Sequence, residues 1–423
     1  MGWLQKLIVP AHVIRIEHLF DGNKPEIGAG TLKTDSISVM RVLFATTAGA
    51  GHFGPLVPFI DGCRRACHEV MVAAPAGFGP AVERAGYPLW PCADTPVEAW
   101  GAIFERLPSL SFNEANRVVI GEVFAGLDAR TTLPRMREAM KEFKPDVVVR
   151  ESAEFGSCVA AELAGIPQVR VAIGLASSEE WALPVAAEYL AHLREEVGLP
   201  GDPNGERLRS TPYLTIVPPL MEEPNIPGPA DAHRFRHPDA EPADLPGWWS
   251  GEPDRLVYVT FGTVAPGMPG IGDLYRGLLA TLADLPIRVL ATVGDGADPA
   301  SMPSPPNVHV ERWFPQADLL PHASAVICHG GFGSVHGALT SGLPLVVVPF
   351  FADQPLNAKR VASLGAGIAV SPPSPEEVRA ALLRVLDDHG FTLVAEQVAE
   401  DYRRLPVADY AAGWLERLVS GPE

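Results

Sequence analysis

A histidine follows the first apolar run of the sequence, where it could act as a base. The hexapeptide GAGHFG (49–54) follows the run 41–46 and precedes a helical pattern. It matches GxGxxG, but the next expected strand ends at Ala74 without the carboxylate that a dinucleotide ribose requires. The positive end of a helix dipole disfavours imidazolium, so His52 could stay a neutral base near neutral pH. The alternative is that His52 only caps the turn.

A carboxylate after another expected strand could support that base. Glu151 comes just after the apolar run 145–149. Because the carboxyl ends of parallel strands meet at one edge of a sheet, Glu151 and His52 can point into one crevice. The carboxylate would fix the imidazole tautomer and stabilise the imidazolium formed when a substrate hydroxyl loses its proton. Glu154 is the rival partner, and either residue could instead be a solvated acid at a helix start.

A second chemical signature lies in the C-terminal half. It consists of WFPQ (313–316), HGGFGS (329–334) and PFFADQ (349–354), and the span 319–352 contains no Asp, Glu, Lys or Arg. The glycine-rich turn follows the apolar run 324–328 and begins a helix, so bare backbone N–H groups would face an anion such as a phosphate. A carboxylate in that span would repel a pyrophosphate, which agrees with its absence.

The side chains of these motifs suit a nucleotide sugar. His329 can donate a hydrogen bond to a phosphate oxygen, and Trp313 offers a flat face for a base. Asp353 and Gln354 supply the acceptors and the donor that sugar hydroxyls need. Structural alternatives remain, with Trp313 as a core aromatic, Gln316 as a turn former and Asp353 as a helix N-cap.

Together these motifs resemble the donor signature of the GT-B, family 1 nucleotide-sugar glycosyltransferases, and GAGHFGP resembles their acceptor-side base motif. The resemblance runs from Met40 to the C-terminus and is strongest to the bacterial antibiotic and secondary-metabolite branch, through GHxxP, FGT and HGGxGS. It implies that His52 is the general base and Glu151 its partner, although the family more often has Asp there. It also implies donor contacts from Thr263, Trp313, Gln316, His329, Gly331, Gly333, Ser334, Asp353 and Gln354.

One departure from the family pattern bears on the donor. Many glucose-using relatives carry a Glu eight residues after the motif histidine, where it holds the ribose hydroxyls, and here that position is Gly337. A 2′-deoxyribose has one hydroxyl fewer, so a thymidine diphosphate (TDP) sugar is favoured over a uridine diphosphate (UDP) sugar. No DxD metal motif occurs, so helix dipole, His329 and backbone donors would stabilise the leaving group. The nucleotide sugar is then a co-substrate, and no other cofactor or metal is expected.

The acceptor side is less defined. Apolar side chains recur in an irregular stretch and could line a pocket for a flat or apolar aglycone, although a core role is slightly favoured: Trp100, Phe104, Leu107, Leu110 and Phe112. The acceptor-binding candidates are Phe53, Trp100, Phe112 and Glu154.

The elements that must position these residues alternate between strands and helices. Apolar runs predict strands at 41–46, 69–74, 145–149 and 168–172, and again at 256–261, 287–293, 307–310, 324–328 and 344–349. This predicts an α/β protein of GT-B architecture, with two Rossmann-like doubly wound domains facing across a cleft. The expected parts are a 1–39 extension outside the fold, an acceptor domain (40–217), a proline-rich linker (218–253), a nucleotide-sugar domain (254–400) and a C-terminal helix (401–423) packing back on the first domain. With nine prolines, the linker is expected to form neither strand nor helix.

Composition narrows the function. The chain has 423 residues and a net charge of −18, which disfavours nucleic acid and anionic lipid as partners. Five cysteines without a CxxC pair, no apolar run long enough for a membrane span and no secretory signal predict a cytoplasmic protein. For the oligomeric state, a homodimer stays an alternative to a monomer.

We therefore expect an inverting, metal-independent glycosyltransferase that moves a deoxy sugar from a TDP-sugar to a hydroxyl of a natural-product aglycone such as a polyketide antibiotic. The alternatives are a UDP-glucose-dependent natural-product glucosyltransferase, a nucleotide-sugar epimerase and a non-catalytic transferase partner.

Overall fold

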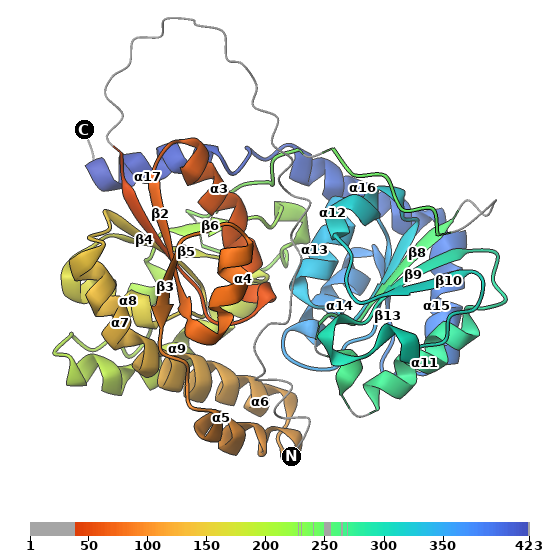
Figure 1. Cartoon of the computed structure of the whole chain (residues 1–423), viewed down its shortest axis with the longest axis horizontal. Coiled ribbons are helices and arrows are strands. Elements are labelled where there is room, and N and C mark those ends of the chain that lie inside the picture. The colour runs from red at the N-terminus through yellow and green to blue at the C-terminus, as the bar shows by residue number, and fades with distance from the viewer. Residues whose placement is uncertain are drawn as a thin grey trace, which may run out of the picture.

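The computed structural model describes residues 39–421 except 227, 230, 240, 249–254, 264 and 269. The expected 1–39 extension lies outside the described residues apart from its last residue. Two α/β domains lie side by side, and the last helices run along one edge of both (Figure 1). No helix in the described ranges is long and apolar enough to cross a membrane.

The N-terminal domain is built on a seven-stranded sheet in the order β3-β2-β1-β4-β5-β6-β7. All of its pairs are parallel, with Val42 opposite both Val70 and Val147. Its strands are β1 (Arg41–Ala45), β2 (Glu69–Pro75), β3 (Leu89–Cys92), β4 (Val147–Glu151), β5 (Gln168–Val171), β6 (Tyr213–Thr215) and β7 (His233–Arg234). Its helices are α2 (Ala50–Phe53), α3 (Val57–Arg65), α4 (Gly79–Arg84), α5 (Val97–Phe104), α6 (Phe112–Val118), the π-helix η4 (Val119–Asp128), α7 (Ala129–Glu142), α8 (Gly156–Ala164), α9 (Ala176–Glu196) and α10 (Glu206–Arg209).

The C-terminal domain repeats this plan with a six-stranded parallel sheet in the order β10-β9-β8-β11-β12-β13. Its strands are β8 (Leu256–Thr260), β9 (Arg288–Thr292), β10 (Val308–Glu311), β11 (Ala325–Cys328), β12 (Leu345–Val347) and β13 (Gly367–Ala369). Its helices are α11 (Ile271–Thr281), α12 (Gln316–Leu319), α13 (Phe332–Thr340), α14 (Gln354–Leu364), α15 (Pro375–Asp387) and α16 (His389–Arg403), and α17 (Tyr410–Ser420) ends the chain.

Both sheets are buried on two faces, which explains why their strands read as continuous apolar runs. In β1, Val42 and Phe44 belong to one core cluster while Leu43 and Ala45 belong to another. The first of these clusters also includes Tyr258 and Cys328 of the second sheet. The two domains therefore share one continuous core in addition to their separate ones.

The chain crosses between the domains twice. At the first crossing, Arg360 of α14 donates hydrogen bonds to the carbonyl oxygens of Met221 (3.0 Å) and Leu220 (2.9 Å). At the second, α17 returns to the N-terminal domain and packs on α3 (Figure 1). The Nε of Arg65 donates to Asp409 at 2.7 Å, just before that helix.

The stretch 218–253 was expected to form no strand and no helix, and this expectation was wrong. It contains a 3-10 turn at Pro219–Met221 and the short strand β7, which pairs with β6. The chain between Pro229 and Pro238 contains no proline, so its backbone N–H groups are available at the sheet edge.

Candidate active site

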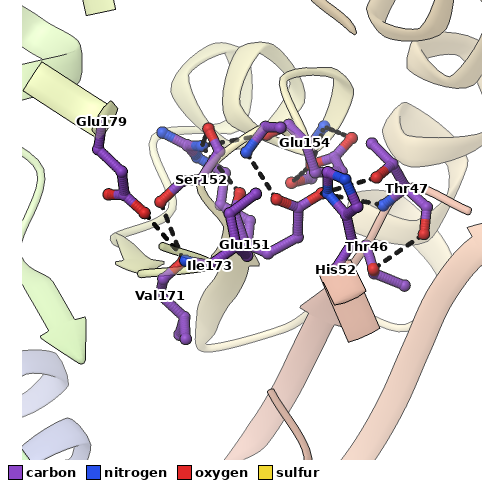
Figure 2. Close-up of polar contacts among 12 residues, drawn as sticks. Thr46, Thr47, His52, Glu151, Ser152, Glu154, Val171, Ile173 and Glu179 are labelled. Atoms are coloured by element: carbon purple, nitrogen blue, oxygen red, sulfur yellow. Dashed lines mark hydrogen bonds and ion pairs between the residues drawn. The ribbon is translucent and has the colours of Figure 1, made fainter. Parts of the chain in front are cut away.

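His52 and Glu151 meet at the carboxyl edge of the first sheet. Glu151 is the last residue of β4, and His52 lies in α2, directly after the neighbouring strand β1 and a turn at Gly49 (φ +120°). Nδ1 of His52 lies 3.1 Å from Oε1 of Glu151 (Figure 2). The His52 side chain is 23% exposed and that of Glu151 is 0% exposed. One ring edge of the histidine is thus fixed by a buried carboxylate.

The Glu151 carboxylate is held by further donors (Figure 2). Its Oε1 accepts hydrogen bonds from the backbone N–H (3.2 Å) and the hydroxyl (2.9 Å) of Thr47, and its Oε2 accepts one from the N–H of Ala153 (2.6 Å). Burial works to raise the pKa of Glu151, but the charge of His52 and these hydrogen bonds outweigh it and lower the pKa. Glu151 is therefore an anion beside His52.

The same pairing strengthens His52 as a base. Burial disfavours its imidazolium form, yet the charge of Glu151, followed by those of Asp353 and Asp128, raises the pKa of His52 above its usual value. When Nδ1–H donates to Glu151, Nε2 carries the lone pair that can accept a proton. The effect of Asp353 also places a residue of the second domain near His52.

Glu154 has a different environment. Its Oε1 accepts a hydrogen bond from the N–H of Ser157 (3.0 Å), its Oε2 is bonded to the hydroxyl of the same residue, and its side chain is almost fully buried. No bond joins it to His52 within the described chain. The geometry favours Glu151 as the partner of His52, and it gives no support to Glu154 as an acceptor contact.

Arg150 holds the turn after β4 through hydrogen bonds to its backbone carbonyl groups. Its Nη1 donates to the carbonyl oxygens of Glu151 (3.2 Å) and Glu154 (3.1 Å), and the residue is fully buried. Glu179 holds the next loop, because its Oε1 accepts from the N–H of Ile173 at 2.9 Å (Figure 2). The Arg150 contacts therefore fix the backbone that carries Glu151, and the Glu179 contact fixes the loop after the neighbouring strand β5.

The glycine-rich turn of the second domain also follows a central strand. His329 comes directly after β11, and α13 begins after Gly331. The imidazole fills the space between two glycines, since a Cβ at Gly331 would lie 2.5 Å from its Nε2 and a Cβ at Gly262 would lie 2.9 Å from its Cε1. Burial lowers the pKa of His329 to about 4, so the ring is neutral at physiological pH.

The remaining phosphate candidates surround this turn. Gly333 and Thr263 are exposed, and Ser334 is half-buried in the first turn of α13. Exposed N–H groups at a helix start, with small side chains around them, can receive a diphosphate. No group of three or more His, Cys, Asp and Glu side chains that could hold a metal ion occurs among the described residues.

The sugar-side candidates lie at the start of α14. Asp353 is at the N-cap position but makes no capping bond; its Oδ2 accepts from Nδ2 of Asn357 at 2.8 Å. Gln354 is buried, and its Oε1 accepts from the N–H groups of Phe350 (2.9 Å) and Phe351 (3.1 Å). Gln354 thus holds the loop with its oxygen, which leaves only its amide N–H groups for a sugar.

Of the base-side candidates, Trp313 lies between β10 and α12, and Gln316 is the first residue of α12. Trp313 and Gln316 are both half-buried. A Cβ at Gly337 would lie 3.1 Å from Oε1 of Gln316 and 3.2 Å from Leu320. The position at which the family resemblance implies a Glu in glucose-using members is therefore next to the Gln316 side chain.

The acceptor candidates divide into two groups. Phe53 is 5% exposed and packs edge-to-face on Phe78 and Tyr87, so it belongs to the core. Trp100 stacks on Phe104 at 4.8 Å, and Phe112 is 37% exposed at the start of α6.

The stretch around Trp100 was expected to be irregular but is mostly helical, and the slight preference for a core role of its five apolar residues was wrong. None of the five is buried. Short helices with Pro108 between them lack a long periodic stripe, which is why the sequence pattern did not reveal them.

Three residues near His52 were missed. Thr47 donates a hydrogen bond to Glu151, and the ring centroid of Phe124 lies 5.2 Å from that of His52. The charge of Asp128 raises the pKa of His52. Phe124 and Asp128 lie on η4, and the rare π-helical geometry of this element was not predicted from the sequence. The pair Thr46-Thr47 after β1 could have been noted as a source of hydroxyl donors.

Comparisons with known proteins agree with this geometry. Residues 276–418 match the family model described as "Erythromycin biosynthesis protein CIII-like, C-terminal domain". The chain is 31% identical to "4'-demethylrebeccamycin synthase" of Lentzea aerocolonigenes, over 90% of this chain and 99% of that protein. It is 33% identical to "L-demethylnoviosyl transferase" of Streptomyces niveus, over 89% of this chain and 97% of that protein.

A solved glycosyltransferase structure has a similar fold over most of this chain. The glycosyltransferase SsfS6 of Streptomyces sp. SF2575, complexed with thymidine diphosphate, superimposes with a TM-score of 0.70 at 26% identity, covering 89% of this chain and 99% of that one. The expected GT-B fold is confirmed.

Proposed function

This chain belongs to the antibiotic branch of the family 1 glycosyltransferases and is a glycosyltransferase, and we propose that it is an inverting, metal-independent enzyme that uses a TDP-sugar. The observation that carries the proposal is the hydrogen bond between Nδ1 of His52 and the buried carboxylate of Glu151. This pair lies in the first domain, close enough to the second for the charge of Asp353 to affect the pKa of His52.

The proposed reaction is a single displacement. Nε2 of His52 takes the proton of an acceptor hydroxyl while the hydroxyl oxygen attacks the anomeric carbon of the sugar. The bond from that carbon to the diphosphate oxygen breaks as the new glycosidic bond forms, so the configuration inverts. The resulting imidazolium is stabilised by Glu151, and TDP leaves with the negative charge.

The leaving diphosphate would be bound by residues of this chain alone. The N-terminus of α13, Ser334, Thr263 and the neutral ring of His329 supply hydrogen-bond donors for its oxygens. Trp313 and Gln316 would contact the base, while Asp353 and the amide N–H groups of Gln354 would contact the sugar. The TDP complex of SsfS6 and the relative named "TDP-daunosamine transferase DnrS" support the choice of TDP.

The proposed acceptor is a hydroxyl-bearing natural-product aglycone such as a polyketide antibiotic. The names of relatives, including "Elloramycin glycosyltransferase ElmGT" of Streptomyces olivaceus, support this class. In this chain, the half-buried Trp100 and the exposed Phe112 offer aromatic surface for it.

The test runs the reaction backwards. Purified protein is incubated with TDP, and in parallel with UDP, and a panel of glycosylated metabolites, and mass spectrometry detects the released aglycone and the new nucleotide sugar. We expect TDP-dependent deglycosylation in the wild type and little in His52→Ala. Product formation with UDP but not with TDP would contradict the proposed donor.

A further inference from the structure

The π-helix η4 (Val119–Asp128) is an unusual element beside His52. It joins α6 to α7 without a break and spans ten residues, whereas most π-helical segments are single turns, which are frequently found at functional sites. It packs against α9 so closely that a Cβ at Gly121 would lie 2.4 Å from the ring of Tyr189. Its backbone position is therefore closely defined by tertiary packing.

This element brings two side chains toward the base. The ring centroid of Phe124 lies 5.2 Å from that of His52. Asp128, the last residue of η4, is fixed through one oxygen: Oδ1 accepts from the hydroxyl of Thr95 (2.6 Å) and from Nε1 of Trp100 (3.3 Å). Nothing in the described ranges donates a hydrogen bond to its other oxygen, Oδ2.

The charge of Asp128 is not matched by a nearby cation. No arginine or lysine of the described chain forms an ion pair with it, and burial raises the pKa of its carboxyl even though Thr95, Trp100 and the charge of His52 work in the other direction. A partly buried carboxylate without a cationic partner is costly, so its presence beside a reacting group suggests a ligand.

We propose that Oδ2 of Asp128 accepts a hydrogen bond from a second hydroxyl or N–H group of the acceptor, and that the acceptor is aromatic, with its ring in contact with Trp100 and Phe124. This deepens the proposed function: the hydroxyl that reacts is bound at His52, and a second donor on the same ring system is bound at Asp128. Trp100 has two roles in this proposal. Its indole N–H fixes Asp128, and its half-buried ring, which Phe104 supports by stacking, offers aromatic surface for the acceptor ring.

The experiment compares two small aromatic probes by calorimetric titration into the full chain, without any donor sugar. One probe is 2,7-dihydroxynaphthalene, and the other is 7-methoxy-2-naphthol, which keeps one hydroxyl but cannot donate from the second position. A hydrogen bond to a charged group is expected to make the wild type prefer the dihydroxy probe by about tenfold or more.

The variants separate the carboxylate from its surroundings. Asp128→Asn can keep the Thr95 and Trp100 bonds through its oxygen while placing an N–H group where Oδ2 was, so the preference should disappear or invert. Phe124→Leu should weaken both probes alike. Glu122→Gln is the matched control, because Glu122 lies on the same π-helix but pairs with Arg106 at the surface, and it should keep the wild-type preference.

Equal affinity of the wild type for the two probes, absence of binding by both, or an unchanged preference in Asp128→Asn would overturn the inference. Thermal unfolding of each variant establishes that it is folded at the titration temperature. Because no turnover is involved, failure of every TDP-sugar to react would count against the proposed function and leave this measurement intact.

Discussion

The two domains place a histidine at corresponding edges of similar sheets, yet the two side chains differ in charge behaviour. In both sheets the strand order reverses at the central pair, β1/β4 in the first and β8/β11 in the second, which is where ligands bind in doubly wound folds. His52 lies at the first of these points and has a raised pKa, whereas His329 lies at the second and has a pKa lowered to about 4.

The difference comes from the neighbours of each ring. Burial disfavours the charged imidazole at both positions. At His52 the carboxylates of Glu151, Asp353 and Asp128 outweigh that effect. At His329 the ring lies between Gly262 and Gly331, which carry no charge. The same architecture thus provides a proton acceptor in one domain and a neutral donor for an anion in the other.

Removing His52 is the strongest way to test this contrast. His52→Ala should lower the rate of the chemical step by about 10²–10⁴-fold, the usual contribution of a positioned proton transfer. Single-turnover measurements with an aliphatic alcohol acceptor report that step, and a phenol already ionised at the assay pH should partly restore the rate. Wild-type turnover of the aliphatic acceptor by His52→Ala would refute the assignment of the base.

Neutralising the partner of His52 should have the next largest effect. An adjacent opposite charge shifts a pKa by about 1–3 units, so Glu151→Gln should lower the pKa of His52 and reduce the rate by roughly 10–100-fold. Activity falls as the pH drops through the pKa of His52, because the base becomes protonated. In the wild type the acid limb of kcat/KM should therefore lie above the usual histidine value, and in Glu151→Gln it should move to lower pH.

Glu154→Gln is the control for this measurement. It replaces a buried carboxylate that binds Ser157 rather than His52, and it should stay close to the wild type in rate and pH profile. A severe defect in Glu154→Gln beside a mild one in Glu151→Gln would transfer the partner role to Glu154.

Substitutions in the donor-binding residues should weaken nucleotide binding rather than slow the chemical step. His329→Ala and Ser334→Ala each remove a hydrogen bond worth about 1 kcal/mol, so each should weaken TDP binding by roughly fivefold to tenfold. Calorimetric titration with TDP measures this, and His52→Ala should bind TDP nearly as well as the wild type. Equal losses in all three variants would contradict the assignment of His52 and His329 to different substrates.

Much of this arrangement could be predicted from the sequence because it depends on local patterns. The apolar runs before His52, Glu151 and His329 identified the strands, and parallel pairing then brought strand ends together. Four short strands, β3, β6, β7 and β13, were missed. They have two to four residues each, and none contains two adjacent β-branched aliphatic residues, as the equally short β11 and β12 do.

The parts that could not be predicted depend on tertiary contacts. Asp128 is distant in sequence from His52, and the position of the helix that carries it, η4, depends on packing against α9. The sequence predicts that Gln354 contacts the sugar, but it does not show that the side-chain oxygen binds the loop at Phe350 and Phe351 and leaves only the amide N–H groups for that contact. The choice between Glu151 and Glu154 depended on where β4 ends, and sequence patterns define such boundaries poorly.

The smallest expected effect concerns the nucleotide, at Gly337 on α13. If the site is adapted to a donor with one ribose hydroxyl fewer, the wild type should bind TDP more tightly than UDP by up to about tenfold, the equivalent of one hydrogen bond. Gly337→Glu should narrow that preference, since a carboxylate there could hold ribose hydroxyls. Its Cβ would lie 3.1 Å from Oε1 of Gln316, so that side chain must move, and Gly337→Ala reports this steric cost alone. Competition titrations of TDP and UDP on the three proteins separate the two contributions. Equal affinity of the wild type for both nucleotides would show that the residue at position 337 does not set the nucleotide preference.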